Sequence, residues 1–115
     1  MSTFSLGAFS AALAVVFGAF GAHLLSGIGP ARLAWWSTAS QYHFMAAVGI
    51  MLAGLLERGR LSAGSPAALF GLGTLLFSGS LYAMALGAPR WFGAITPLGG
   101  LSLIAAFIWL GARAL

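Results

Sequence analysis

The sequence predicts an all-α membrane protein, an antiparallel four-helix transmembrane bundle. Of its 115 residues, 61% are hydrophobic and 5% are charged, whereas a soluble domain carries about 25% charged residues. A domain this small exposes much surface for its volume, yet the chain contains no lysine, aspartate, asparagine or cysteine. Its surface must therefore face lipid.

Four apolar runs are the predicted spans, approximately residues 4–25, 35–56, 66–87 and 92–112. Each is close to the roughly 20 residues that cross a hydrocarbon core of about 30 Å. In that core a segment satisfies its own backbone only as a helix, and the runs lack the alternation of a β-barrel. The connections between the runs are short, which makes neighbouring helices antiparallel. Residues 1–115 therefore form a single transmembrane domain.

Local signals mark where each helix begins. The first run has no basic segment before it and is too long for a signal peptide, so we expect it to remain as a span. Gly29-Pro30 predicts a short interfacial helix through "ARLAWW" before the second span, and Ser65-Pro66 is typical of an N-cap followed by the first helical residue.

The fourth span has a broken start. Either Thr96-Pro97 begins the helix after a looped segment, or the helix kinks there; neighbouring glycines favour the looped start. Broken helices line binding sites in transporters, but an ordinary N-capped span is the favoured interpretation. The residues concerned are Arg90, Trp91, Thr96, Pro97, Gly99 and Gly100.

Small residues recur at four-residue spacing in the first and third spans, which favours close helix approach in lipid. The first row is Ser10, Ala14, Gly18 and Ala22, and the second is Ala67, Gly71, Gly79, Ala83 and Gly87. We expect Gly18, Ala22, Gly71, Gly79 and Ala83 to pack against neighbouring helices.

Both histidines lie near the junction of the first two spans. His23 ends the first span and His43 is in the polar first part of the second. Two histidines can ligate haem or a metal, but the chain offers no third ligand there, so we predict no cofactor and no metal. The favoured hypothesis is a polar cluster of His23, Gln41, Tyr42 and His43 at the membrane edge, and an interfacial helix end is the alternative. In "LFSGSLY", Ser78 and Tyr82 are one turn apart in mid-membrane, where hydroxyls bond carbonyls or another helix.

The net charge of +4 does not indicate nucleic-acid binding, because five arginines are spread along the chain. They lie near the ends of the apolar runs, as is typical of the membrane boundary. Arg58, Arg60 and Arg113 lie on one side, and Arg32 and Arg90 on the other, which favours cytoplasmic termini. Glu57, the only acid, can pair with Arg58 or Arg60.

Four blocks taken together resemble a known family: "FGAFGAH", "YHF", "LFSGSLY" and "RWFGAITPLGG". They are similar to those of the YgdD/YwdK-like family of small four-span bacterial inner-membrane proteins, which has a eukaryotic transmembrane relative. The resemblance covers nearly the whole chain. It implies the fold and a multi-pass location in the inner membrane, and no activity.

These observations predict a non-enzymatic membrane module that binds a partner protein, a lipid or a small ligand. The alternative is a small channel or transporter that works as a homo-oligomer, because four short spans enclose little volume. An intramembrane enzyme is disfavoured, since no carboxylate or thiol lies within a span. The expected partners are membrane lipid, a second copy or another membrane protein, and no nucleic acid.

Overall fold

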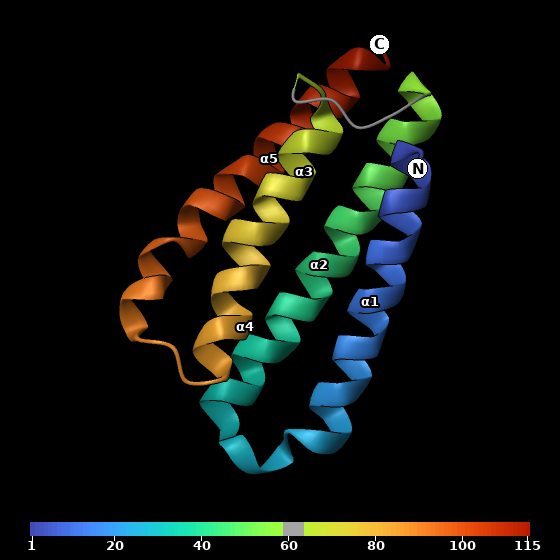
Figure 1. Ribbon diagram of the computed structural model, residues 1–115. Coiled ribbons are helices and arrows are strands. Elements are labelled where there is room, and N and C mark those ends of the chain that lie inside the picture. Colours follow the sequence, from blue (N-terminus) through green and yellow to red (C-terminus); the bar gives the residue numbers. More distant parts are fainter. Residues whose placement is uncertain (59–63) are drawn as a thin grey trace.

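The described part of the chain forms four helical columns, which lie side by side (Figure 1). In this computed structural model, which describes residues 1–58 and 64–115, the columns are α1 (Thr3–Leu24), α2 (Pro30–Glu57), α3 and α4 together (Pro66–Gly73 and Gly79–Ala85), and α5 (Thr96–Arg113). A π turn, Thr74–Ser78, joins α3 to α4, and a 3-10 turn, Arg90–Ala94, precedes α5. Each column is long and apolar enough to cross a membrane. The predicted all-α membrane bundle is confirmed.

The dimensions of the molecule match those of a bilayer. Its longest extent is 45 Å, and a bilayer measures about 40–45 Å with its headgroup layers. The 28 residues of α2 span about 42 Å at 1.5 Å per residue. The middle of α2 therefore lies near the centre of the hydrocarbon core, and its first turns lie in the headgroup layer.

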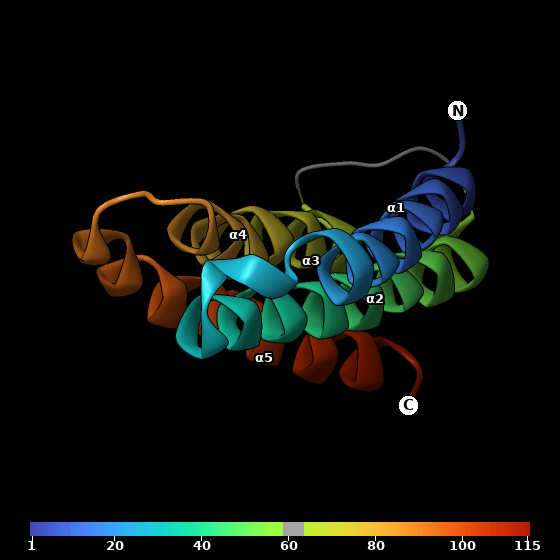
Figure 2. The same ribbon diagram turned by 90° about the horizontal axis from the view of Figure 1, so that it is seen from below.

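The helices pack in the order α1, α2, α3 with α4, and α5, and the view along the bundle in Figure 2 shows α1 and α5 on opposite sides. Both termini lie at one end of the bundle (Figure 1). At that end Arg113 donates a 2.7 Å hydrogen bond to Glu57. The predicted partner Arg58 does not make this bond, and Arg60 lies outside the described residues.

The helix starts follow local chemistry, with one difference from the prediction. The Ser2 hydroxyl caps α1 by accepting from the Ser5 amide, and prolines open α2, α3 and α5. The separate interfacial helix is wrong: "ARLAWW" is the continuous start of α2, and only a 3-10 turn, Ser26–Ile28, precedes it. Residues 31–36 contain no helix breaker, so a helix begun at Pro30 continues into the span.

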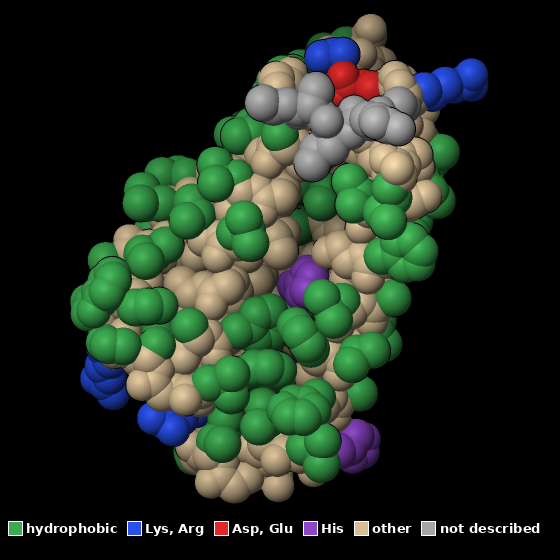
Figure 3. Space-filling model, viewed as in Figure 1, with side chains coloured by type: hydrophobic (Ala, Val, Ile, Leu, Met, Phe, Trp, Pro, Cys, Tyr) green, Lys and Arg blue, Asp and Glu red, His purple; other side chains and the backbone are tan. Residues whose placement is uncertain are grey.

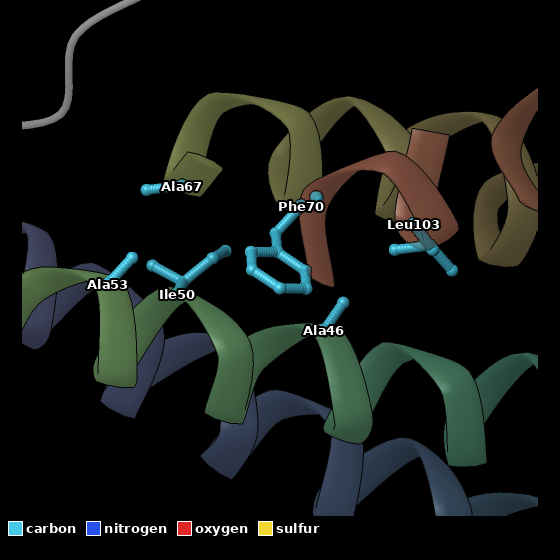
Figure 4. Packing of buried hydrophobic residues seen from close by; sticks show 7 residues of the cluster. Ala46, Ile50, Ala53, Ala67, Phe70 and Leu103 are labelled. Atoms are coloured by element: carbon cyan, nitrogen blue, oxygen red, sulfur yellow. The ribbon is translucent and has the colours of Figure 1, made fainter. Parts of the chain in front are cut away.

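The main core lies between α2, α3 and α5 (Figure 4). The Phe70 ring is fully buried there, above Ala46 and Ile50 of α2 and near Leu103 of α5. Gly49 makes room for it, because a Cβ at Gly49 would lie 2.5 Å from the Phe70 ring. Glycine and alanine therefore let the helix backbones approach around one large side chain, as is typical of membrane bundles.

The contacts of α1 include Ser10 and Ala14 of the predicted row, but its closest backbone approaches lie elsewhere. The buried residues of α1 are Thr3, Gly7, Ala14 and Gly21. A Cβ at Gly7 would lie 2.8 Å from the Ala47 carbonyl oxygen. One at Gly18 would lie at an ordinary 3.7 Å from Ser40, and Ala22 is exposed. A strict four-residue row turns around the helix, whereas two helices that lie along each other keep contact at a spacing of about 3.5 residues.

Of the predicted row on the third span, only Ala67 lies in the main core. Nothing lies within 4 Å of a Cβ at Gly71, and Gly79 and Ala83 are only half-buried. The π turn accounts for Gly79 and Ala83, since its wider turn rotates the residues after it relative to α3. Gly71 comes before the π turn and lies on a face of α3 that no neighbouring helix approaches. The close approach falls instead at Gly73, where a Cβ would lie 2.5 Å from the Leu103 side chain.

Candidate functional site

The one histidine that the fold buries lies in the middle of the bundle. His43 comes thirteen residues after Pro30, about 20 Å along α2, and is 4% exposed. An imidazole at this depth is costly unless its nitrogens are paired. An ionisable side chain inside a span is by default a candidate functional residue.

Both ring nitrogens of His43 have partners, each on a different helix. Nε2 shares a 3.0 Å hydrogen bond with the Ser10 hydroxyl of α1, and Nδ1 shares one of 3.0 Å with the Tyr82 hydroxyl of α4. These three residues, which we call the polar centre, therefore join α1, α2 and α4 across the bundle.

Aromatic rings cover one side of the polar centre. The Tyr82 ring lies edge-on to Phe17 and Trp36, at centroid distances of 5.2 and 4.6 Å. The Trp36 indole donates a 2.6 Å hydrogen bond to the Phe17 carbonyl oxygen. Gly21 is required here, because a Cβ at this position would overlap the indole ring. The aromatic contacts restrict Tyr82 to one orientation toward His43.

Further hydroxyls hold the helices that carry the centre. Ser78 donates a 2.8 Å hydrogen bond to the Ala39 carbonyl oxygen of α2, one turn before Tyr82 on the same side. Ser80 shares a 2.6 Å hydrogen bond with Thr96 at the start of α5. The prediction that the mid-membrane hydroxyls bond carbonyls or another helix is confirmed for Ser78 and Tyr82.

A count of protons defines what the polar centre can do. With a neutral imidazole, it holds three polar hydrogens: two hydroxyl hydrogens and one N–H. The two internal hydrogen bonds use two of them. If Nδ1 carries the proton, the hydrogen left over belongs to Tyr82; if Nε2 carries it, the hydrogen left over belongs to Ser10. In either tautomer, one O–H donor remains to pair with an acceptor outside the centre.

The structure does not bring the four residues of the predicted cluster together. His23 is exposed at the end of α1, and Gln41 and Tyr42 are exposed on α2. Figure 3 shows one histidine side chain recessed in the hollow of the bundle and the other far from it, near one end. Successive helix residues differ by about 100° in direction, so Gln41, Tyr42 and His43 cannot share a face. Tyr42 instead packs against Phe77, with ring centroids 4.6 Å apart.

Sequence reasoning missed Ser10 as a partner of His43. The available signal was depth: Ser10, His43 and Tyr82 all lie well inside their spans, where polar groups pair with one another. The prediction started the second span at Trp35, which placed His43 near the membrane edge and hid this signal. The helix begins five residues earlier, at Pro30. In the described residues, no group of three or more potential metal ligands occurs.

The fourth column begins as the sequence favoured, with a looped segment followed by a helix that starts at Thr96-Pro97. Arg90 and Trp91 are exposed in the 3-10 turn, and α5 begins at Thr96 with Pro97 in its first turn. Gly99 lies directly against the backbone of Leu76 and Phe77 in the π turn, whereas Gly100 meets only the Phe77 ring. The start of α5 thus braces the column that carries Tyr82.

The fold and its buried polar centre define a small multi-pass helical membrane protein. Residues 17–100 match the family described as a protein of unknown function, DUF423, and the chain belongs to this family. It is 42% identical over 109 residues to the UPF0382 membrane protein YwdK of Bacillus subtilis, covering 91% of this chain and 89% of that protein. It is 38% identical over 104 residues to the UPF0382 inner membrane protein YgdD of Escherichia coli K12, covering 87% of this chain and 79% of that protein.

A relative from Staphylococcus haemolyticus, the UPF0382 membrane protein SH2409, is 37% identical over 107 residues, covering 91% of this chain and 88% of the relative. No solved structure matches the chain. The family resemblance predicted from the four sequence blocks is confirmed. With four candidate spans, these relatives place the chain in the inner membrane as a multi-pass protein.

Proposed function

We propose that the protein is a non-enzymatic membrane module that binds a lipid-soluble ligand through an acceptor oxygen at the polar centre. The observation that carries the proposal is the O–H donor that the two internal hydrogen bonds of His43 leave over. In a low-dielectric interior a donor without an acceptor is costly. A ligand oxygen that accepts from it therefore gains free energy on binding.

Access to the centre is from the side of the bundle. α1 packs on α2, and α3 and α4 pack on the neighbouring face of α2. A histidine side chain is visible in the hollow of this face in Figure 3. Ser10 and Tyr82 are half-buried, whereas His43 is nearly covered. The hydroxyls are therefore the atoms that a ligand entering from the bilayer would meet.

The depth of the centre restricts the class of ligand. Phospholipid ester and phosphate groups lie near the interface, whereas the polar centre lies about 20 Å along a helix of about 42 Å. A ligand that carries its acceptor at this depth is a lipid-soluble carbonyl compound, such as a quinone. The neighbouring aromatic rings suit a flat, apolar ring system.

The test is quenching of tryptophan fluorescence by a decyl-substituted benzoquinone added to the purified protein in detergent. We expect saturable quenching in the wild-type protein. Tyr82→Phe should weaken binding about fivefold, because a hydrogen bond contributes about 1 kcal/mol and 1.4 kcal/mol is tenfold in affinity.

The matched control is Tyr42→Phe, which removes the chain's other tyrosine hydroxyl from an exposed position. It should leave the affinity unchanged. Non-saturable quenching in the wild-type protein, or equal weakening by Tyr42→Phe and Tyr82→Phe, would refute the proposal. The oligomeric channel or transporter stays a prediction.

A further inference from the structure

We propose that a second site, at the end of the bundle opposite the termini, binds a phosphate group between two arginines. The site is a pocket of about 360 Å³. Its lining includes Pro30, Arg32 and Trp35 of α2, Met84 of α4, and Ala88 and Arg90 from the connection between α4 and α5. We call it the arginine pocket. It is separate from the polar centre and goes beyond the proposed function.

Tertiary structure brings the two arginines to this pocket from distant parts of the chain. Arg32 is in the first turns of α2, and Arg90 opens the 3-10 turn before α5. The Arg32 side chain reaches toward the α4–α5 connection, since a Cβ at Gly87 would lie 3.7 Å from its Nη2 atom. Both arginines are exposed to solvent, so a ligand can reach their guanidinium groups.

The charge of these arginines has no counterpart within the chain. Glu57 is the only acidic side chain in the sequence, and it is bonded to Arg113 at the other end of the bundle. Figure 3 shows basic side chains at both ends and the acidic one at the end that carries the termini. Two cations that line one pocket repel each other unless an anion lies between them. The missing partner of the arginine pocket is therefore an external anion.

The shape and depth of the pocket point to phosphate chemistry. Guanidinium groups pair with phosphate oxygens in a bidentate manner. The first turns of α2 lie in the headgroup layer, the depth of a phospholipid phosphate, and Trp35 is a residue type of the membrane interface. Met84 and Ala88 add an apolar wall against which the glycerol and first acyl carbons of a lipid can pack. An anionic phospholipid fits all of these features, and free phosphate shares the chemistry of its headgroup.

The experiment is native mass spectrometry of the detergent-solubilised wild-type protein, titrated separately with phosphatidylglycerol, phosphatidylcholine and inorganic phosphate. We expect phosphatidylglycerol to bind about tenfold more tightly than phosphatidylcholine. Arg32→Gln and Arg90→Gln should each weaken phosphatidylglycerol binding about tenfold, because each removes a charge-assisted contact. Both side chains are exposed, so the variants should fold.

The matched control is Arg58→Gln, an arginine at the opposite end of the bundle, which should not change the binding. If inorganic phosphate competes with phosphatidylglycerol at micromolar concentration, the pocket recognises free phosphate; if it does not, the pocket recognises the lipid. Equal affinity for the two lipids without phosphate binding, or equal weakening by Arg58→Gln, would overturn the proposal. These lipid-binding measurements do not test quinone binding at the polar centre, so one proposal can be refuted while the other stands.

Discussion

The contact between α5 and the π turn provides the sharpest test of how this bundle packs. A Cβ at Gly99 would overlap the Phe77 amide nitrogen and lie 2.7 Å from the Leu76 carbonyl carbon. Both are backbone atoms, which cannot rotate away as a side chain can. One residue later the situation differs, because a Cβ at Gly100 would lie 3.7 Å from the Phe77 ring, an ordinary contact distance. The same chemical change at two neighbouring positions therefore has opposite expected effects.

The magnitudes follow from two opposing terms. Overpacking a well-packed contact costs about 1–3 kcal/mol, and the rigid backbone at Gly99 places it at the upper end. Replacing glycine by alanine inside a helix returns about 1 kcal/mol of helix propensity. Gly99→Ala should therefore lower the free energy of unfolding by about 2 kcal/mol. Gly100→Ala should raise it by up to about 1 kcal/mol, so the two variants differ by about 3 kcal/mol.

The assay is reversible unfolding of the detergent-solubilised protein by increasing SDS, followed by circular dichroism. Gly111→Ala is a second control, since nothing lies within 4 Å of a Cβ at that position. If Gly99→Ala is as stable as the wild-type protein, or changes in the same direction and amount as Gly100→Ala, the inference of close backbone contact at the π turn is wrong.

Two further predictions concern the end of the bundle that carries the termini. Glu57→Gln should cost less than about 1 kcal/mol of stability in the same SDS assay, and the difference should vanish at about 1 M salt, because the Glu57–Arg113 pair is partly exposed; a larger, salt-independent loss would contradict this. A C-terminal alkaline phosphatase fusion should be inactive and a C-terminal fluorescent protein fusion bright, since the arginine count favours cytoplasmic termini; phosphatase activity at this position would reverse the topology.

Much of the fold was predictable because its causes are local. A span of about 20 apolar residues must become a helix in lipid, and Ser65-Pro66 and Thr96-Pro97 are local signals that favour a helix start. The error at the start of α2 has a local cause too. Trp35 and Trp36 suggested a helix boundary, but tryptophan does not interrupt a helix. The boundary lies before Pro30, at the 3-10 turn Ser26–Ile28.

The site was predictable only in part. Tyr82 was predicted to be a mid-membrane hydroxyl that bonds a carbonyl or another helix, and His43 to be a member of a polar cluster at the membrane edge. Their pairing depends on which helix face meets which neighbour, and the π turn at Thr74–Ser78 changes that face halfway along a column. No residue in "TLLFS" is a sequence signal for a π turn, so the direction of the Tyr82 side chain could not be predicted from regular helical spacing.

The sequence by itself determined the environment of this protein. Its composition, four apolar runs and proline signals specify a multi-pass helical bundle, because lipid allows few other solutions. Only the tertiary structure decided which residues meet. It paired His43 with Ser10 and Tyr82, left His23 exposed, and brought Arg32 and Arg90 to one pocket. The physical reason is that contacts between helices depend on rotation and register, and the small residues that permit close approach here occur on every face of these helices.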